Sequence, residues 1–142
     1  MAAMRLRIMF LCVLLGACAT AEPLVSAPPL GVALNCTADT AMTCPRAGCR
    51  APGPQSPSRL ALIVPARGEV GRYCISGTCE DARFLPTLTR ALGWTAQVST
   101  GPGLARPLGE VEIGSERSTF VLRQPRAQAM YVWGGYCTPA GS

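Results

Sequence analysis

Six cysteines between positions 36 and 137 constrain the fold of this chain more than any other feature. The chain has eight cysteines among its 142 residues, and two of them, Cys12 and Cys18, belong to an apolar N-terminal segment. The remaining six are Cys36, Cys44, Cys49, Cys74, Cys79 and Cys137. An even number of cysteines in a small exported domain predicts a framework of disulfides, so the location of the protein has to be considered first.

The N-terminal segment has the pattern of a bacterial secretory signal. Arg5 and Arg7 form a short basic region, and the apolar run over residues 8–15 is too short to span a bilayer as a stable anchor. The sequence therefore predicts export to the periplasm or to the outer membrane.

Two cleavage sites overlap at the end of this segment. Residues 15–18 resemble a lipobox, whose use would make 1–17 a lipoprotein signal and Cys18 the lipidated N-terminus. Residues 19–21 form an Ala-x-Ala site, whose use would make 1–21 an ordinary signal peptide. The sequence leaves both outcomes open, one giving a lipid-anchored protein and the other a soluble one.

The rest of the chain divides into an arm and one domain. Three prolines in residues 22–31 predict a proline-rich arm or tether, and residues 32–142 are enough for a single domain with one core. Thirteen prolines and fifteen glycines keep the apolar runs short. Short runs favour strands and turns over long helices.

Apolar and polar residues alternate in several short segments, which is the pattern of half-buried strands. The segments are 60–64, 94–99, 110–113, 119–123 and 130–133. They recur about every ten to twelve residues with turn residues between them, as in antiparallel meanders. The sequence predicts an all-β fold, a small disulfide cross-linked barrel or sandwich. Residues 84–92 are the one stretch that could be helical.

The spacing of the cysteines ranks their pairings, although sequence alone cannot separate them. Cys44–Cys49 and Cys74–Cys79 each enclose a glycine-containing loop that suits a tight hairpin. Cys36 and Cys137 would then join the first strand to the last. The alternative is that the two hairpins form a four-thiolate zinc site. An oxidising compartment and the absence of histidine argue against zinc, so we expect no metal.

The charged residues exclude several classes of function. All thirteen basic residues are arginines, with no lysine and no histidine. Without the two in the signal, eleven arginines face eight carboxylates, a net charge of +3. These arginines are scattered and form no basic stripe, so nucleic acid is not an expected partner.

Catalysis would have to rest on carboxylates, because the usual bases of nucleophilic catalysis are missing. A glycosidase pair could be formed by Glu110 with Glu112, or by Glu80 with Asp81. The simpler interpretation makes the first pair the outward half of an amphipathic strand. It makes the second pair the exposed partners of Arg72 or Arg83 across a hairpin. We therefore predict no enzymatic activity and no cofactor.

The densest aromatic segment is Met130–Cys137, which contains two adjacent glycines. It could be a binding groove in which a ligand approaches the backbone, and the glycines would allow that approach. We interpret it instead as the terminal strand that closes a barrel.

The short signal, the Arg72-Tyr73-Cys74 sequence and the late Cys137 resemble small exported bacterial β-barrel proteins. In outline they are similar to the membrane-bound inhibitors of c-type lysozyme, periplasmic lipoproteins with an eight-stranded barrel closed by a disulfide. That family carries Ser-Gly-x-x-Tyr on its inhibitory loop. Here the nearest candidates are Ser76-Gly77-Thr78-Cys79, which has no tyrosine in place, and Gly68, five residues before Tyr73. No site residue is therefore carried over.

The expected function is that of a non-enzymatic exported envelope protein, a lipoprotein if Cys18 is acylated, with a binding or structural role. Its partner would be the membrane surface if Cys18 is lipidated, or another protein of the envelope. The alternative is an inhibitor of a secreted or host hydrolase. Such an inhibitor would need an exposed loop, at Pro65–Tyr73 or at the Cys74–Cys79 hairpin.

Overall fold

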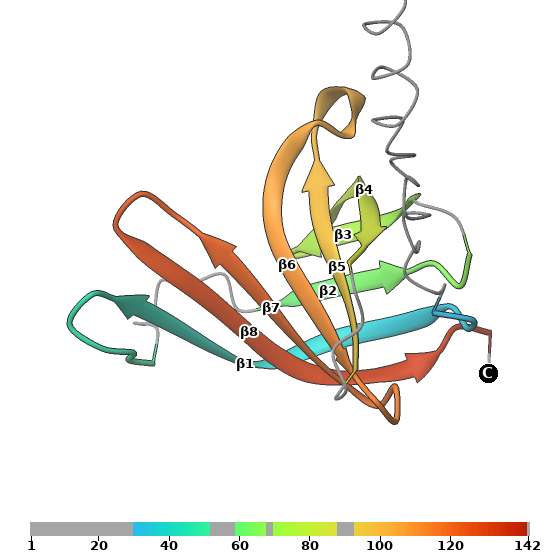
Figure 1. Cartoon of the computed structure of the whole chain (residues 1–142), viewed down its shortest axis with the longest axis horizontal. Helices are drawn as coiled ribbons and strands as arrows, with labels where there is room; N and C mark the ends of the chain where they lie inside the picture. Colours follow the sequence, from blue (N-terminus) through green and yellow to red (C-terminus); the bar gives the residue numbers. More distant parts are fainter. Residues whose placement is uncertain (1–29, 52–58, 68–69, 88–92, 142) are drawn as a thin grey trace, which may run out of the picture.

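Eight antiparallel strands follow one another around a closed barrel in chain order, and the last strand pairs with the first (Figure 1). The computed structural model describes residues 30–51, 59–67, 70–87 and 93–141. The strands are β1 (Leu34–Pro45), β2 (Leu60–Val64), β3 (Val70–Ile75), β4 (Thr78–Pro86), β5 (Gly93–Thr100), β6 (Arg106–Gly114), β7 (Thr119–Pro125) and β8 (Ala129–Pro139), with a short 3-10 turn η1 (Pro102–Leu104) between β5 and β6. The predicted all-β fold is confirmed, and it is a barrel.

The five alternating segments lie in β2, β5, β6, β7 and β8. Three strands lack such a signal. β1 and β4 carry threonine, alanine or charged residues at about half of their positions, and β3 is a short strand that contains Gly71 and Arg72. The expected helix over residues 84–92 is wrong at its start, because Phe84–Pro86 is the end of β4 and pairs with β5. Residues 88–92 lie outside the described part of the chain.

Alternate side chains of the strands point into the barrel and form one apolar core. Phe84 on β4 and Phe120 on β7 are its largest fully buried members. Leu30 also belongs to the core, with 2% of its surface exposed, and the Gly31 amide donates to the Ala66 carbonyl. The domain therefore begins at least two residues before position 32, inside the segment that the sequence assigns to the arm.

Three disulfides cross-link the described residues, and they are the pairs that the cysteine spacing favours. Cys36 on β1 and Cys137 on β8 are directly opposite each other in the register, so their bridge ties the two strands that close the barrel. The Cys44–Cys49 and Cys74–Cys79 disulfides each cross-link the two sides of a hairpin. A four-thiolate zinc site is excluded for these cysteines because their sulfurs are bonded to each other.

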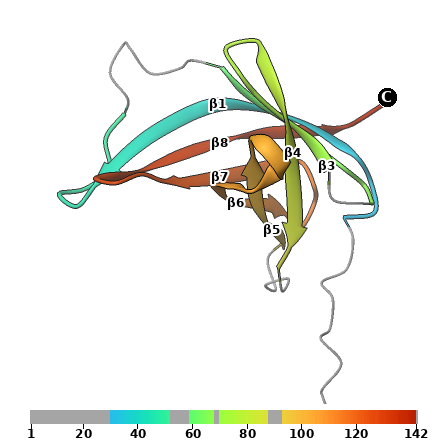
Figure 2. The ribbon, with the colours of Figure 1, turned by 90° about the horizontal axis from the view of Figure 1, so that it is seen from above.

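The barrel is asymmetric, because β1 pairs with its two neighbours over different lengths. β2 pairs with β1 only over Leu34–Thr37, whereas β8 pairs with β1 from Leu34 to Pro45. The far halves of β1 and β8, together with β7, therefore extend sideways as a wing (Figures 1 and 2).

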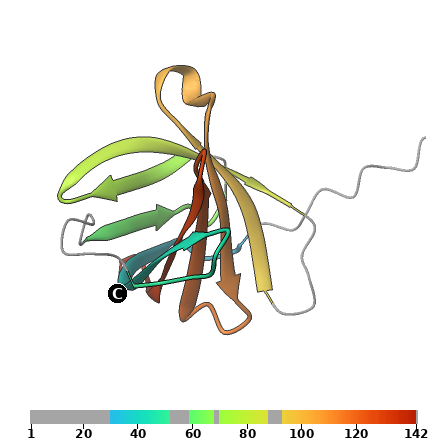
Figure 3. The ribbon, with the colours of Figure 1, turned by 90° about the vertical axis from the view of Figure 1, so that its left-hand side faces the viewer.

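The turns divide between two ends of the barrel. The β3–β4, β5–β6 and β7–β8 connections lie at one end, which we call the mouth, and the β6–β7 turn lies at the opposite end. Figure 3, turned so that the wing faces the viewer, shows the β5–β6 connection with η1 at the top. The described residues include no helix long and apolar enough to cross a membrane.

Candidate functional site

Two hollows lie side by side at the mouth. The first, of about 410 Å³, is lined by Ile75, Gln124, Arg126 and Tyr131. The second, of about 450 Å³, is lined by Tyr73, Ile75, Thr78 and Glu80. Ile75 on β3 borders both of them. The first opens between β3 and the wing, where β2 covers only the first residues of β1, and the second lies on the β3–β4 hairpin itself.

A chain of hydrogen bonds between buried side chains forms the floor of the mouth. Trp133 on β8 donates from Nε1 to Gln124 Oε1 over 3.0 Å, and Gln124 on β7 donates from Nε2 to the Tyr73 hydroxyl over 3.0 Å. Gln124 is 2% exposed and follows Phe120 and Leu122 along the inward face of β7. A buried amide with both ends bonded holds three strands in one arrangement.

The direction of these bonds is set by chemistry. An indole N–H can only donate, so Gln124 must present its oxygen to Trp133 and its amide nitrogen to Tyr73. The Tyr73 oxygen then accepts, and its own hydrogen is left to be donated. No described residue accepts that hydrogen. The floor therefore offers the Tyr73 hydroxyl as a donor to whatever fills the mouth.

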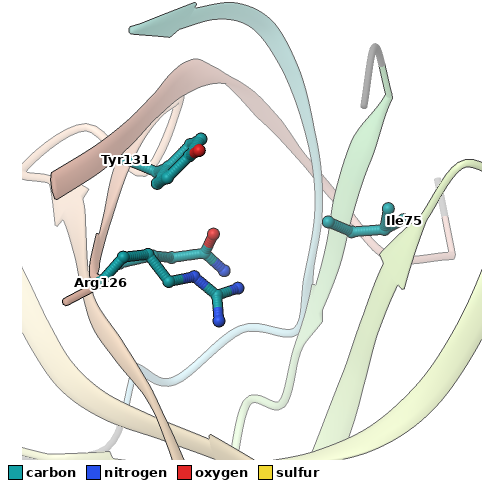
Figure 4. A pocket seen from close by; sticks show the side chains of 4 residues that line it. Ile75, Arg126 and Tyr131 are labelled. Atoms are coloured by element: carbon teal, nitrogen blue, oxygen red, sulfur yellow. The ribbon is translucent and has the colours of Figure 1, made fainter. Parts of the chain in front are cut away.

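Arg126 provides the positive charge of the site. It lies in the turn after β7, and its guanidinium points into the pocket beside the ring of Tyr131, with Ile75 facing them from β3 (Figure 4). No carboxylate of the described residues forms an ion pair with it. Arginine binds carboxylate and phosphate groups through several N–H donors at once.

Glu80 is the one carboxylate among the described residues lining the two hollows, and its charge is balanced. Arg106 on β6 donates from Nη2 to both Glu80 oxygens, at 2.9 and 3.2 Å, and to Thr100 Oγ1 at 3.1 Å. The expected partner across the hairpin is wrong for Glu80, because the ion pair comes from β6. Asp81 lies opposite Arg72 in the register of β3 and β4.

The second pair of carboxylates lies away from the mouth. Glu110 accepts a hydrogen bond from Gln97, and Glu112 forms an ion pair with Arg123 at 3.0 Å. Both side chains alternate along β6 with the buried Val111 and Ile113. The two glutamates are thus placed as the outward half of an amphipathic strand. No group of three metal-ligating side chains occurs among the described residues.

No protein family model, curated protein or solved structure matches this chain. The interpretation of the mouth therefore rests on its own geometry.

The aromatic segment Met130–Cys137 combines the two roles weighed for it. It forms most of β8, which closes the barrel, and it also contributes Tyr131 to the wall and Trp133 to the floor of the mouth. Gln124 and Arg126 are missed by the sequence analysis because they flank a proline and belong to a turn signal. The inward register of β7, continued from Phe120 and Leu122, is the signal that would have found Gln124. Cys18 lies outside the described residues.

Burial raises the pKa of the Tyr73 hydroxyl above its ordinary value of 10.0, although the Gln124 hydrogen bond and the Arg126 charge act in the opposite direction. Above about pH 10 the unfolded chain loses this proton while the folded chain keeps it. The free energy of unfolding should therefore be unaffected by this group well below pH 10 and should fall as the pH rises above about 10. Tyr73→Phe should reduce that fall in urea unfolding, and an equal fall in both proteins would contradict the assignment.

Proposed function

We propose that this protein is a non-catalytic exported binding protein whose mouth holds a small anionic ligand with an apolar body. The observation that carries the proposal is the Arg126 guanidinium, which points into the pocket without an acidic partner among the described residues. An arginine near the Tyr73 hydroxyl, whose hydrogen is left to be donated, favours a ligand that brings acceptors and negative charge.

The walls and the size of the pocket support a small molecule. Ile75 and Tyr131 provide apolar surface opposite each other. A volume of about 410 Å³ is within the range of sites for small organic ligands. The ligand would place its charged group at Arg126 and its apolar part between the two walls.

The three disulfides are consistent with a location outside the cytoplasm, where such bridges persist. A binding role needs no general base, and the chain has neither histidine nor lysine. Glu80 is held by Arg106, so it is not proposed as an acid or a base.

The test compares two probes of the same shape that differ in charge. We expect 2-naphthoate to bind more tightly than the neutral 2-naphthamide in isothermal titration calorimetry. Arg126→Gln removes the charged partner, so it should weaken the naphthoate complex by about tenfold to a hundredfold and leave the naphthamide complex nearly unchanged.

Arg117→Gln is the matched control. Arg117 is exposed in the β6–β7 turn at the opposite end of the barrel, so its loss changes the net charge equally without touching the mouth. Failure of both probes to bind, or an equal loss in the two variants, would overturn the proposal.

A second candidate function, inhibition of a secreted or host hydrolase, is favoured by the Cys74–Cys79 hairpin. Its turn residues Ser76 and Gly77 are exposed, and the disulfide fixes the loop. A rigid loop loses little entropy when it enters an active-site cleft. The measurement is the rate of cell-wall hydrolysis by a c-type lysozyme with the protein in excess. Ser76→Trp should relieve inhibition if this loop enters the cleft. If the unaltered protein leaves the rate of hydrolysis unchanged, c-type lysozyme is not its target.

A further inference from the structure

The tip of the wing carries two loops that project away from the barrel (Figure 1). One is the Cys44–Cys49 loop after β1, and the other is the turn between β7 and β8. They are neighbours, because Pro45 pairs with Ala129 and a hollow of about 290 Å³ is lined by both. We call these two loops the basic tip.

Two arginines of the first loop of the basic tip are exposed, Arg46 and Arg50, whereas Arg126 in the second loop turns its guanidinium into the mouth. No described carboxylate pairs with any of them. The described acidic residues lie elsewhere, and the ion pairs of Glu80 and Glu112 are made by other arginines. The tip thus carries two outward positive charges close together, although the chain as a whole has only a modest excess of them.

Exposed apolar side chains lie directly behind these charges. Met42 on β1 is 44% exposed and Met130 on β8 is 39% exposed. Met42 is opposite Val132 and Met130 is opposite Cys44, so all four share one face of the wing. Methionine side chains are long, flexible and apolar, which suits contact with a deformable apolar phase.

The basic tip is also held in place before it meets a partner. The Cys44–Cys49 disulfide closes its first loop, and Thr43 and Arg50 exchange two backbone hydrogen bonds at 2.9 Å. In the second loop the Arg126 amide donates to the Ala129 carbonyl at 2.8 Å. A preorganised surface loses little conformational entropy on binding.

We propose that the basic tip docks on an anionic phospholipid bilayer. The guanidinium groups of Arg46 and Arg50 would contact lipid phosphates, while Met42 and Met130 would enter the apolar region just below the headgroups. Clustered arginines next to exposed apolar side chains match the two layers of a membrane surface, charged outside and apolar beneath. This docking uses the folded domain itself and needs no lipid on Cys18. It relies on Arg46 and Arg50 and not on Arg126, so it can be tested separately from ligand binding in the mouth.

The experiment measures co-sedimentation of the exported chain with vesicles. The chain carries Cys18→Ser, so that no acyl group can contribute to binding. Vesicles containing phosphatidylglycerol should bind it at least tenfold more tightly than vesicles of phosphatidylcholine alone. Each tip arginine is expected to contribute about fivefold, so Arg46→Gln combined with Arg50→Gln should weaken binding about 25-fold.

Two further variants show whether the tip is responsible. Arg67→Gln with Arg117→Gln removes the same charge from exposed positions at the opposite end of the barrel and should change binding less than twofold. Met42→Ser should weaken vesicle binding by the same factor at low and at high salt concentration, because it removes an apolar contact and not a charge. Equal losses in the two arginine pairs, or no preference for phosphatidylglycerol, would overturn the proposal. Tighter binding to polyglutamate than to vesicles would also overturn the proposal, because it would make the basic tip a site for an acidic protein.

The test is independent of the mouth, because it leaves Arg126 intact. Weak vesicle binding with normal naphthoate binding would overturn the docking proposal alone. The reverse result would overturn the proposed ligand site and leave the docking surface standing.

Discussion

Replacing Cys36 and Cys137 by alanine together is expected to lower the free energy of unfolding by about 4 to 5 kcal/mol. The bridge joins residues 101 positions apart, so it restricts the unfolded chain more than either short bridge does. Cys36 and Cys137 are both buried, with 1% and 6% of their surfaces exposed, so the loss of sulfur also removes core contacts. Urea unfolding of the oxidised protein at neutral pH measures the change.

The matched control is the pair Cys44→Ala and Cys49→Ala. Its bridge spans a sequence separation of 5, and chain-entropy arguments give it about 2 kcal/mol. Both residues lie at the wing tip, outside the apolar core. Equal losses from the two double variants would mean that closing the barrel by a covalent bond adds nothing to its stability.

Gly135→Ala is expected to lower the free energy of unfolding by at least about 3 kcal/mol and to lower Tm by more than about 10 °C. A Cβ at this position would lie 2.1 Å from the Thr37 carbonyl oxygen and 2.7 Å from the Ala38 Cα. Both are backbone atoms of β1, so they cannot rotate away. The closing pair of strands would have to separate, which thermal unfolding followed by circular dichroism would detect.

Gly134→Ala, one residue earlier, tests this explanation. Its added Cβ would meet Thr40 Oγ1 at 2.9 Å, and that side chain is exposed and free to turn. We expect the free energy of unfolding to fall by less than about 1 kcal/mol, because the Thr40 side chain turns away and loses its hydrogen bond to the Gly134 carbonyl. If the two alanine variants have the same Tm, the backbone contact with β1 is not the reason that β8 has glycine at position 135.

The architecture could be predicted where burial imposes a pattern on the sequence. Residues 110–113 and 119–123 alternate because one face of β6 and β7 meets the core and the other meets solvent. The far half of β1 has no such contrast, because the wing leaves both of its faces partly exposed. The cysteine spacing compensates for this, since the position of Cys36 in the first strand and Cys137 in the last is meaningful only in a closed meander.

The mouth was much harder to predict. Tyr73, Gln124 and Trp133 are distant in sequence, and they meet only because the register of β7 and β8 and the curvature of the barrel bring their inward faces together. Arg126 follows a proline in a turn, where an exposed charge is ordinary. Its direction into the pocket depends on how the wing departs from the barrel, which no local pattern encodes.

The order of the strands has a consequence for biogenesis. Each strand from β2 to β8 pairs with the strand that precedes it in the chain, so pairing can proceed in the order in which the strands are synthesised. β1 is the exception, because its long partner β8 emerges last. Before β8 is added, the edge of β1 that faces β8 has no pairing strand, and Cys36 lacks its disulfide partner, whereas both cysteines of each short bridge are already present. The Cys36–Cys137 bridge can therefore form only when the last strand is in the chain, and it fixes the closure of an edge through which two incomplete chains would otherwise associate.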